Sequence, residues 1–354
     1  MIHGGNIYKA AELLGVDERE ILDFSASINP LGIPESVRTA IEKCLISIDS
    51  YPDPDIIRLT ERIAAFHNIS PDSILCGNGS TELIYLIPRA MRPGKVLITA
   101  PTFSEYERAC WLAGAEVTRY KLNSEDNFDV DADSFIAAMK SSGAEMVFLC
   151  TPNNPTGRLV SRRDVLQIAE AAHELQCLLI VDEAFMDFIP HESVIDAVKV
   201  NPFLIVLRSM TKFYAIPGLR LGYGVFNREI VDQIRVSREP WTVSTLAQIA
   251  GIAALNDNAY RDETICTMKE EKAFMEQGLT GMGLACIPSA VNYYLMRIEG
   301  SKDLVMKLRG KGILIRDCSS FAGLDESYIR IAVKSRTNNT TLLAEMRQWL
   351  TASS

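Results

Sequence analysis

The strongest constraint on the fold is an alternation of short apolar runs with longer helical patterns, which extends from Asp72 to Gly224. The runs are rich in β-branched and aliphatic residues and are too short to be helices. They cover residues 73–76, 95–100, 116–120, 145–150, 177–181, 203–207 and 221–225. Because strands that alternate with helices form parallel sheets covered on both faces, we expect an α/β domain with a mostly parallel seven-stranded sheet.

The pattern changes after this domain. Residues 243–255 and 260–279 have helical composition, and strand-like segments at 292–298, 313–317 and 328–333 then alternate with helical ones at 302–308 and 340–350. This order is typical of a compact α+β unit. A chain of 354 residues also exceeds the roughly 250–300 residues at which one core stops growing. We predict a large domain at 45–270 and a smaller one made of 1–44 and 271–354.

Charge and cysteine usage narrow the class of protein. The net charge of −9 comes from dispersed carboxylates without a basic run, so we expect no nucleic-acid partner. The eight cysteines have no spacing typical of a metal site and read as reduced core residues. The chain shows neither a leader pattern nor an apolar run of membrane-spanning length, and we expect a cytoplasmic protein with no membrane partner and no metal.

Two charged residues follow apolar strands at the edge where open α/β sheets bind ligands. Asp182 ends the run 177–181, and Lys212 lies in Arg208-Ser209-Met210-Thr211-Lys212 after the next run. Taken alone, such an aspartate is usually a cap and such a lysine a surface charge. Their convergence in one crevice instead indicates a reactive amine beside a fixed carboxylate.

Three further segments point into the same crevice. Gly79, Ser80 and Thr81 lead from a strand into a helix, where free backbone N–H groups can hold a phosphate. Phe103 follows the next strand and can stack on a flat ring, and Asn154 lies in a turn after another strand. A lysine, a carboxylate, an anion cradle and an aromatic ring are what a protein must supply to pyridoxal 5'-phosphate (PLP).

Motifs along nearly the whole chain carry a family resemblance. Asn154-Pro155-Thr156-Gly157, Asp182-Glu183-Ala184, Ser209-Met210-Thr211-Lys212 and Gly218-Leu219-Arg220-Leu221-Gly222-Tyr223 resemble the fold-type I, aspartate-aminotransferase-like PLP enzymes. The resemblance implies a Schiff base on Lys212, with Asp182 on the ring nitrogen, Asn154 on the ring hydroxyl and Phe103 stacked on the ring. It implies that the remaining cofactor-binding positions are Gly79, Ser80, Thr81, Ser209, Thr211, Arg220 and, from the neighbouring subunit of a homodimer, Tyr51. Phe185 stands where the family has a tyrosine that donates to the ring hydroxyl.

Within this family the chain is similar to two branches that act on phosphorylated substrates, the histidinol-phosphate aminotransferases and the threonine-phosphate decarboxylases of cobalamin biosynthesis. Segments 3–6, 23–32 and 315–324 look like the decarboxylases. This likeness implies a substrate phosphate held by His3, Gly4, Gly5 and Arg316, and a substrate carboxylate held by Arg330, Asn29 and Asn154.

The bond that breaks on PLP is the one that stands perpendicular to the ring. Gripping the substrate at both ends is therefore expected to expose its carboxylate for loss as CO2. L-Threonine O-3-phosphate would yield (R)-1-amino-2-propanol O-2-phosphate. The alternatives are histidinol-phosphate transamination and, from another class, a non-catalytic PLP-binding regulator.

Overall fold

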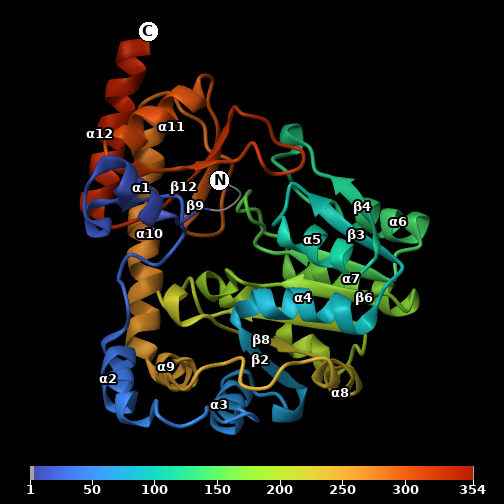
Figure 1. The fold of residues 1–354 in the computed structure, drawn as a ribbon. Helices are drawn as coiled ribbons and strands as arrows, with labels where there is room; N and C mark the ends of the chain where they lie inside the picture. Colours follow the sequence, from blue (N-terminus) through green and yellow to red (C-terminus); the bar gives the residue numbers. More distant parts are fainter. Residues whose placement is uncertain (1–3, 354) are drawn as a thin grey trace.

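A computed structural model describes residues 4–353 and has a seven-stranded sheet at its centre (Figure 1). The strand order is β2-β8-β7-β6-β5-β3-β4. The β3–β4, β3–β5, β5–β6 and β6–β7 pairs are parallel, whereas β8 is antiparallel to both β7 and β2. The strands are β2 (Ile74–Asn78), β3 (Lys95–Ala100), β4 (Glu116–Lys121), β5 (Met146–Cys150), β6 (Leu178–Asp182), β7 (Leu204–Ser209) and β8 (Leu221–Val225). The predicted sheet is confirmed, including its mostly parallel pairing.

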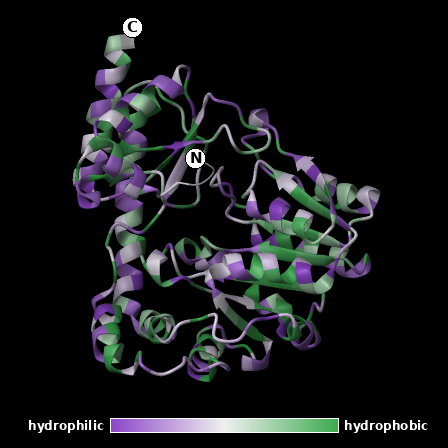
Figure 2. Cartoon of the chain, in the orientation of Figure 1, coloured by the Kyte–Doolittle hydropathy of each residue, from purple (hydrophilic) through white to green (hydrophobic). Residues whose placement is uncertain are grey.

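Side-chain alternation along the strands explains why helices cover both faces of this sheet. On β5, Val147 and Leu149 join one hydrophobic cluster, and Phe148 joins the other. Helices α6 (Ala132–Ser142) and α7 (Arg162–Glu174) bury apolar side chains in the first cluster. Helices α4 (Gly79–Met91), α5 (Glu105–Leu112) and α8 (Arg228–Val236) do so in the second. Figure 2 shows the resulting concentration of hydrophobic residues on the central strands.

The remaining strands form two small sheets. In the first, β12 (Tyr328–Ala332) pairs antiparallel with both β11 (Arg316–Asp317) and β9 (Tyr293–Arg297). In the second, β1 (Leu22–Asp23) runs parallel to β10 (Ile313–Leu314). Helices α1 (Ile7–Leu14), α11 (Ser301–Gly310) and α12 (Arg336–Ser353) lie with these strands in the upper part of Figure 1.

The N-terminal region contacts both parts of the molecule. Buried residues of α1 cluster with Leu314 of β10, as expected for a segment that packs on the smaller unit. Helix α2 (Glu35–Cys44) instead packs against α9 (Thr245–Asn256), as does α3 (Ile57–His67). The 23-residue helix α10 (Asn258–Thr280) links the upper and lower parts (Figure 1).

Short 3₁₀ helices complete the fold at Glu18–Glu20, Leu45–Ser47, Pro71–Ser73, Ser124–Asp126, Met186–Phe188, Pro190–Glu192, Ile195–Lys199 and Pro217–Leu219. Among residues 4–353, no helix combines the length and apolarity needed to cross a bilayer.

Candidate active site

One cavity collects side chains from the carboxyl ends of four sheet strands and from the smaller sheets. Phe103 follows β3, Asn154 follows β5, Asp182 ends β6, and Ser209 ends β7. Opposite them lie Arg316 of β11 and Arg330 of β12. The other predicted residues on the cavity wall are Gly4, Ser80, Thr81, Thr211, Lys212 and Arg220. Residues far apart in the sequence therefore meet where the strand pattern places a ligand.

Lys212 is the amine of this cavity. Burial lowers the pKa of its side chain to about 8. Three nearby cations, those of Arg330, Arg220 and Lys334, act in the same direction. The Lys212 carbonyl accepts a hydrogen bond of 3.1 Å from the backbone N–H of Asn29, which ties the lysine to the N-terminal segment. A lysine whose pKa lies this low has a larger fraction of neutral, reactive amine near neutral pH than an ordinary lysine has.

Asp182 is the carboxylate of the cavity, and it is almost completely buried. Its Oδ2 accepts a hydrogen bond of 2.6 Å from the Tyr106 hydroxyl, and its Oδ1 accepts one of 2.9 Å from the Ala184 backbone N–H. Burial raises the pKa of the Asp182 carboxyl to about 6, although both hydrogen bonds oppose this rise. A fixed, desolvated carboxylate of this kind suits a protonated ring nitrogen.

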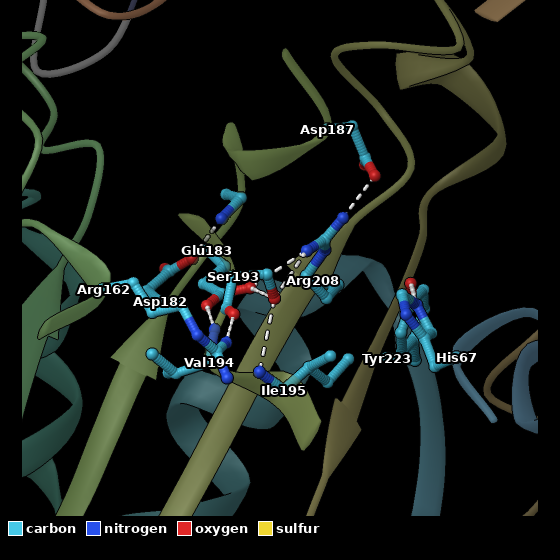
Figure 3. Close-up of polar contacts among 11 residues, drawn as sticks. His67, Arg162, Asp182, Glu183, Asp187, Ser193, Val194, Ile195, Arg208 and Tyr223 are labelled. Atoms are coloured by element: carbon cyan, nitrogen blue, oxygen red, sulfur yellow. Dashed lines mark hydrogen bonds and ion pairs between the residues drawn. The ribbon is translucent and has the colours of Figure 1, made fainter. Parts of the chain in front are cut away.

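A buried ionic cluster supports the strand ends beneath Asp182 (Figure 3). Arg208 of β7 donates to Glu183 Oε2 at 2.9 Å and also bonds the Asp187 carboxylate. Glu183 also accepts hydrogen bonds from the Ser193 hydroxyl at 2.6 Å and from the Val194 N–H at 2.8 Å. Because buried charges are tolerated only when they are paired and hydrogen-bonded, this cluster locks β6 to β7 where they bear Asp182 and Ser209.

The anion cradle lies at the N-terminus of α4. Its N-cap residue, Asn78, makes no side-chain hydrogen bond to the helix amides, and Ser80 and Thr81 face the cavity. Gly222 on β8 allows this close approach, since a Cβ there would lie 2.3 Å from the Ser80 nitrogen. The hydroxyls of Ser209 and Thr211 lie 2.8 Å apart on the adjacent wall. Helix amides, hydroxyls and the Arg220 guanidinium form a suitable site for a phosphate.

Arg330 of β12, in the smaller sheet, contacts Asn154, which follows β5 of the central sheet. Arg330 donates to Asn154 Oδ1 and, at 2.8 Å, to the Ser25 carbonyl, and its guanidinium lies 5.0 Å from the centre of the Tyr293 ring. With its oxygen engaged by Arg330, the Asn154 amide has its NH2 available to donate to a ring hydroxyl. Phe185 also lines the cavity and meets the Tyr293 ring edge-on. It supplies no hydroxyl there.

Arg316 and Arg330 face each other directly across the β11–β12 pair. Both are nearly buried. Arg316 donates to the Ser320 hydroxyl at 2.9 Å, and burial lowers the pKa of its guanidinium. Like charges placed opposite each other in a sheet are unfavourable unless anions lie between or beside them. The arrangement therefore suits a ligand with more than one anionic group.

Four predicted positions do not line the cavity. The Asn29 amide donates instead to the Phe213 carbonyl and to the hydroxyls of Tyr260 and Thr264, at 2.8–2.9 Å. Gly5 lies just behind the wall, where its N–H donates to the Ser25 hydroxyl at 2.8 Å. Gly79 packs against the Arg220 side chain, and Tyr51 is 83% exposed beside Trp241. His3 lies outside the described residues.

The cavity also contains residues that sequence reasoning missed, including Ser25, Ser27, Tyr106, Cys150 and Phe321. For Tyr106 a signal was present, because it follows Phe103 by three residues at the start of a helix and such neighbours share a face. Ser25, Ser27 and Phe321 lie in segments 23–32 and 315–324, which resemble the decarboxylases, whereas no comparable signal marks Cys150.

The fold and the cavity together define a PLP-dependent enzyme of the α/β type, with an amine, a ring carboxylate, a phosphate cradle and an aromatic ring in one place. The chain belongs to the aminotransferase class I and II family, whose model matches residues 19–346. PLP is its cofactor, and the residues present fit that group.

The individual relatives include both decarboxylases and aminotransferases. The threonine-phosphate decarboxylase of Salmonella typhimurium is 44% identical over 99% of this chain and 96% of its own length. The adenosylcobalamin biosynthesis bifunctional protein CobDQ of Leptospira interrogans is 32% identical over 96% of this chain and 40% of its own length. The solved histidinol-phosphate aminotransferase from Clostridium acetobutylicum is 32% identical, with a TM-score of 0.87 over 93% of this chain and 99% of its own. Similarity over nearly the whole chain thus extends to both a decarboxylase and an aminotransferase.

Proposed function

We propose that this chain decarboxylates L-threonine O-3-phosphate to (R)-1-amino-2-propanol O-2-phosphate, as a step of cobalamin biosynthesis. The observation that carries the proposal is the buried Arg316–Arg330 pair across from Lys212, which offers two separate anion grips for a small substrate with a phosphate and a carboxylate. The full-length similarity to a threonine-phosphate decarboxylase and the similarity to a cobalamin biosynthesis protein support it.

Each end of the substrate has its own residues in this proposal. Arg316 binds the phosphate with Gly4 on the same cavity wall, and Gly5 and His3 are its further proposed contacts. Arg330 binds the carboxylate and is held for this by the Ser25 carbonyl and by Asn154. Asn29 acts indirectly, because its backbone N–H fixes the Lys212 carbonyl and its amide is engaged in the core.

When bound, PLP supplies an electron sink for the pair of electrons that CO2 leaves at Cα. Asp182 would hold the ring nitrogen, Asn154 would donate to the ring hydroxyl, and the α4 cradle with Ser209, Thr211 and Arg220 would hold the cofactor phosphate. Lys212 Nζ delivers the proton that replaces CO2 at Cα. Its lowered pKa, about 8, allows it to take up and release a proton near neutral pH.

Product analysis tests the reaction. The holoenzyme incubated with L-threonine phosphate is expected to release one CO2 for each amine formed, without an added keto acid. Incubation with histidinol phosphate and 2-oxoglutarate tests the aminotransferase, whose backbone this chain shares. Keto-acid product in the first assay, or faster turnover in the second, would assign the chain to transamination.

The working unit in this proposal is a cytoplasmic homodimer in which Tyr51 completes the neighbouring site. An exposed apolar stretch supports it, with Leu45, Ile46, Ile48 and Tyr51 followed by Trp241, against which Tyr51 lies at 5.0 Å between ring centres. All eight cysteines are free, which fits a reducing compartment. Mixing Tyr51→Ala with Lys212→Ala subunits should restore activity, because one hybrid site has both residues intact. No restoration would show that sites are not shared.

A further inference from the structure

Tyr106 lines the cofactor cavity, and the family motifs do not assign it a role. It lies in the first turn of α5, where 1% of its surface is exposed. Its ring stacks on Phe148 with centres 5.0 Å apart and planes at 13°, and it meets Phe103 edge-on at 5.6 Å. One rigid phenol therefore contacts both the expected ring-stacking residue and, through its hydroxyl, the Asp182 carboxylate.

The surroundings of Tyr106 and Asp182 determine which of the two holds the proton of this hydrogen bond. Burial and the neighbouring Asp182 charge raise the pKa of Tyr106 above its usual value, so the phenol keeps its proton. At 2.6 Å from Asp182 Oδ2 it is the donor to a charged acceptor, which is the stronger class of hydrogen bond.

Asp182 needs such a donor because its other surroundings disfavour its charge. Burial is the largest of these influences, and the adjacent Glu183 carboxylate adds to it. The Cys150 thiol and the Tyr293 phenol face the same region without supplying a positive charge. Besides Tyr106, the donor that the structure shows on this carboxylate is the Ala184 backbone N–H.

We propose that Tyr106 is a positioning residue that acts on the cofactor through Asp182. Its hydroxyl keeps the carboxylate ionised and in a single orientation, in which Asp182 receives the N–H of the bound pyridine ring. Tyr106 itself does not touch the substrate. It thereby sets how strongly the enzyme holds the ring nitrogen in its protonated, electron-withdrawing form.

A comparison of two ligands isolates this effect from a general loss of structure. Full-length apoenzyme is titrated with PLP and with its 1-deaza analogue, in which CH replaces the ring nitrogen. Wild type is expected to prefer PLP, and Tyr106→Phe to reduce that preference roughly tenfold, which corresponds to the lower end of the range for one hydrogen bond to a charged group. Affinity for the analogue should change little, because it has no nitrogen for Asp182 to hold.

The matched control is Tyr294→Phe. The Tyr294 hydroxyl donates to the Glu276 carboxylate at the same distance, 2.6 Å, and Tyr294 is equally buried but does not line the cavity. This variant should leave the PLP preference unchanged. An unchanged preference in Tyr106→Phe, or an equal loss in both variants, overturns the proposal.

A second variant covers the case in which Tyr106→Phe does not fold. 3-Fluorotyrosine at position 106 keeps the shape of the phenol and strengthens it as a donor, so the preference for PLP should rise. No change would also overturn the proposal. Failure of the wild type to bind PLP would instead refute the cofactor site itself.

Discussion

The two ends of the cavity differ in how their charges are satisfied. At the cofactor end, Asp182 and Glu183 already have their donors within the protein, from Tyr106, Ala184, Arg208, Ser193 and Val194. At the substrate end, Arg330 and Lys334 donate to neutral oxygens, those of Asn154, Ser25 and Ala26. The carboxylates of the cofactor end thus have their donors within the protein. At the substrate end, the Asp23 carboxylate acts on Lys334 and Lys212 and raises their pKa values, and an anionic ligand can complete the remaining positive charge. This difference makes the substrate end the part that distinguishes reactions on a shared backbone.

The largest effect is expected from Lys212→Ala. It would remove the proposed covalent attachment and the proposed proton donor together, so turnover should fall by at least about 10³-fold. The visible absorbance of the attached cofactor should disappear, while non-covalent PLP binding through the α4 cradle persists. Spectrophotometry of the purified variant measures the visible absorbance, and equilibrium dialysis measures the non-covalent binding of PLP. An unchanged visible spectrum would show that another residue holds the cofactor.

Arg208→Met tests whether the cofactor end depends on its ionic cluster. The substitution leaves Glu183 buried without its cation, which typically destabilises a protein by about 3–5 kcal/mol. Urea unfolding of the apoenzyme measures the change. Arg119→Met is the control, because Arg119 pairs with Glu107 in a half-exposed setting where such pairs contribute about 0–1 kcal/mol. Equal losses in both variants would contradict the proposed support of Asp182.

Arg330→Gln should impair the use of substrate while leaving the binding of PLP nearly unchanged. Loss of a buried charged partner for the substrate carboxylate is expected to lower kcat/KM by roughly 30- to 100-fold, with PLP affinity changed less than about twofold. The control is Arg297→Gln on neighbouring β9, whose guanidinium also lies over a tyrosine ring, that of Tyr328, but outside the cavity. A loss of PLP affinity equal to the loss of kcat/KM would show that Arg330 maintains the cofactor end instead.

The sequence predicts the residues at the strand ends better than it predicts the loop residues. The seven strands follow from local patterns. Asp182 at the end of β6, and Phe103, Asn154 and Lys212 shortly after β3, β5 and β7, reach the cavity because strand direction places them there. Asn29 shows the limit. Its side-chain direction is set by Phe213, Tyr260 and Thr264, which lie 184, 231 and 235 residues away.

Helix α2 shows a second limit of the same kind. Its amphipathic pattern is compatible with several packing surfaces, and α9, about two hundred residues further along the chain, decides between them. Strand ends can be placed from local sequence, but a loop side chain or a surface helix cannot, because its partners come from distant segments.

The smallest predicted effect is a change in the pKa of Lys212 caused by the loss of a cation at the substrate end. Lys334 is one of the cations that lower the pKa of Lys212, so Lys334→Met should raise that pKa above about 8, by less than about one pH unit. Only the neutral amine reacts with an aldehyde. The rate of PLP attachment to wild-type apoenzyme should therefore rise with pH, with a midpoint near 8, and the variant should reach its plateau at higher pH.

The control for this shift is Lys272→Met. Lys272 is also mostly buried, and burial lowers its pKa to about 8 as well, but it donates to the Ser289 and Val291 carbonyls away from the cavity. Its removal should leave the midpoint in place. A shift in both variants, or in neither, would mean that the substrate-end cations do not tune Lys212, and the two ends of the cavity would then act independently.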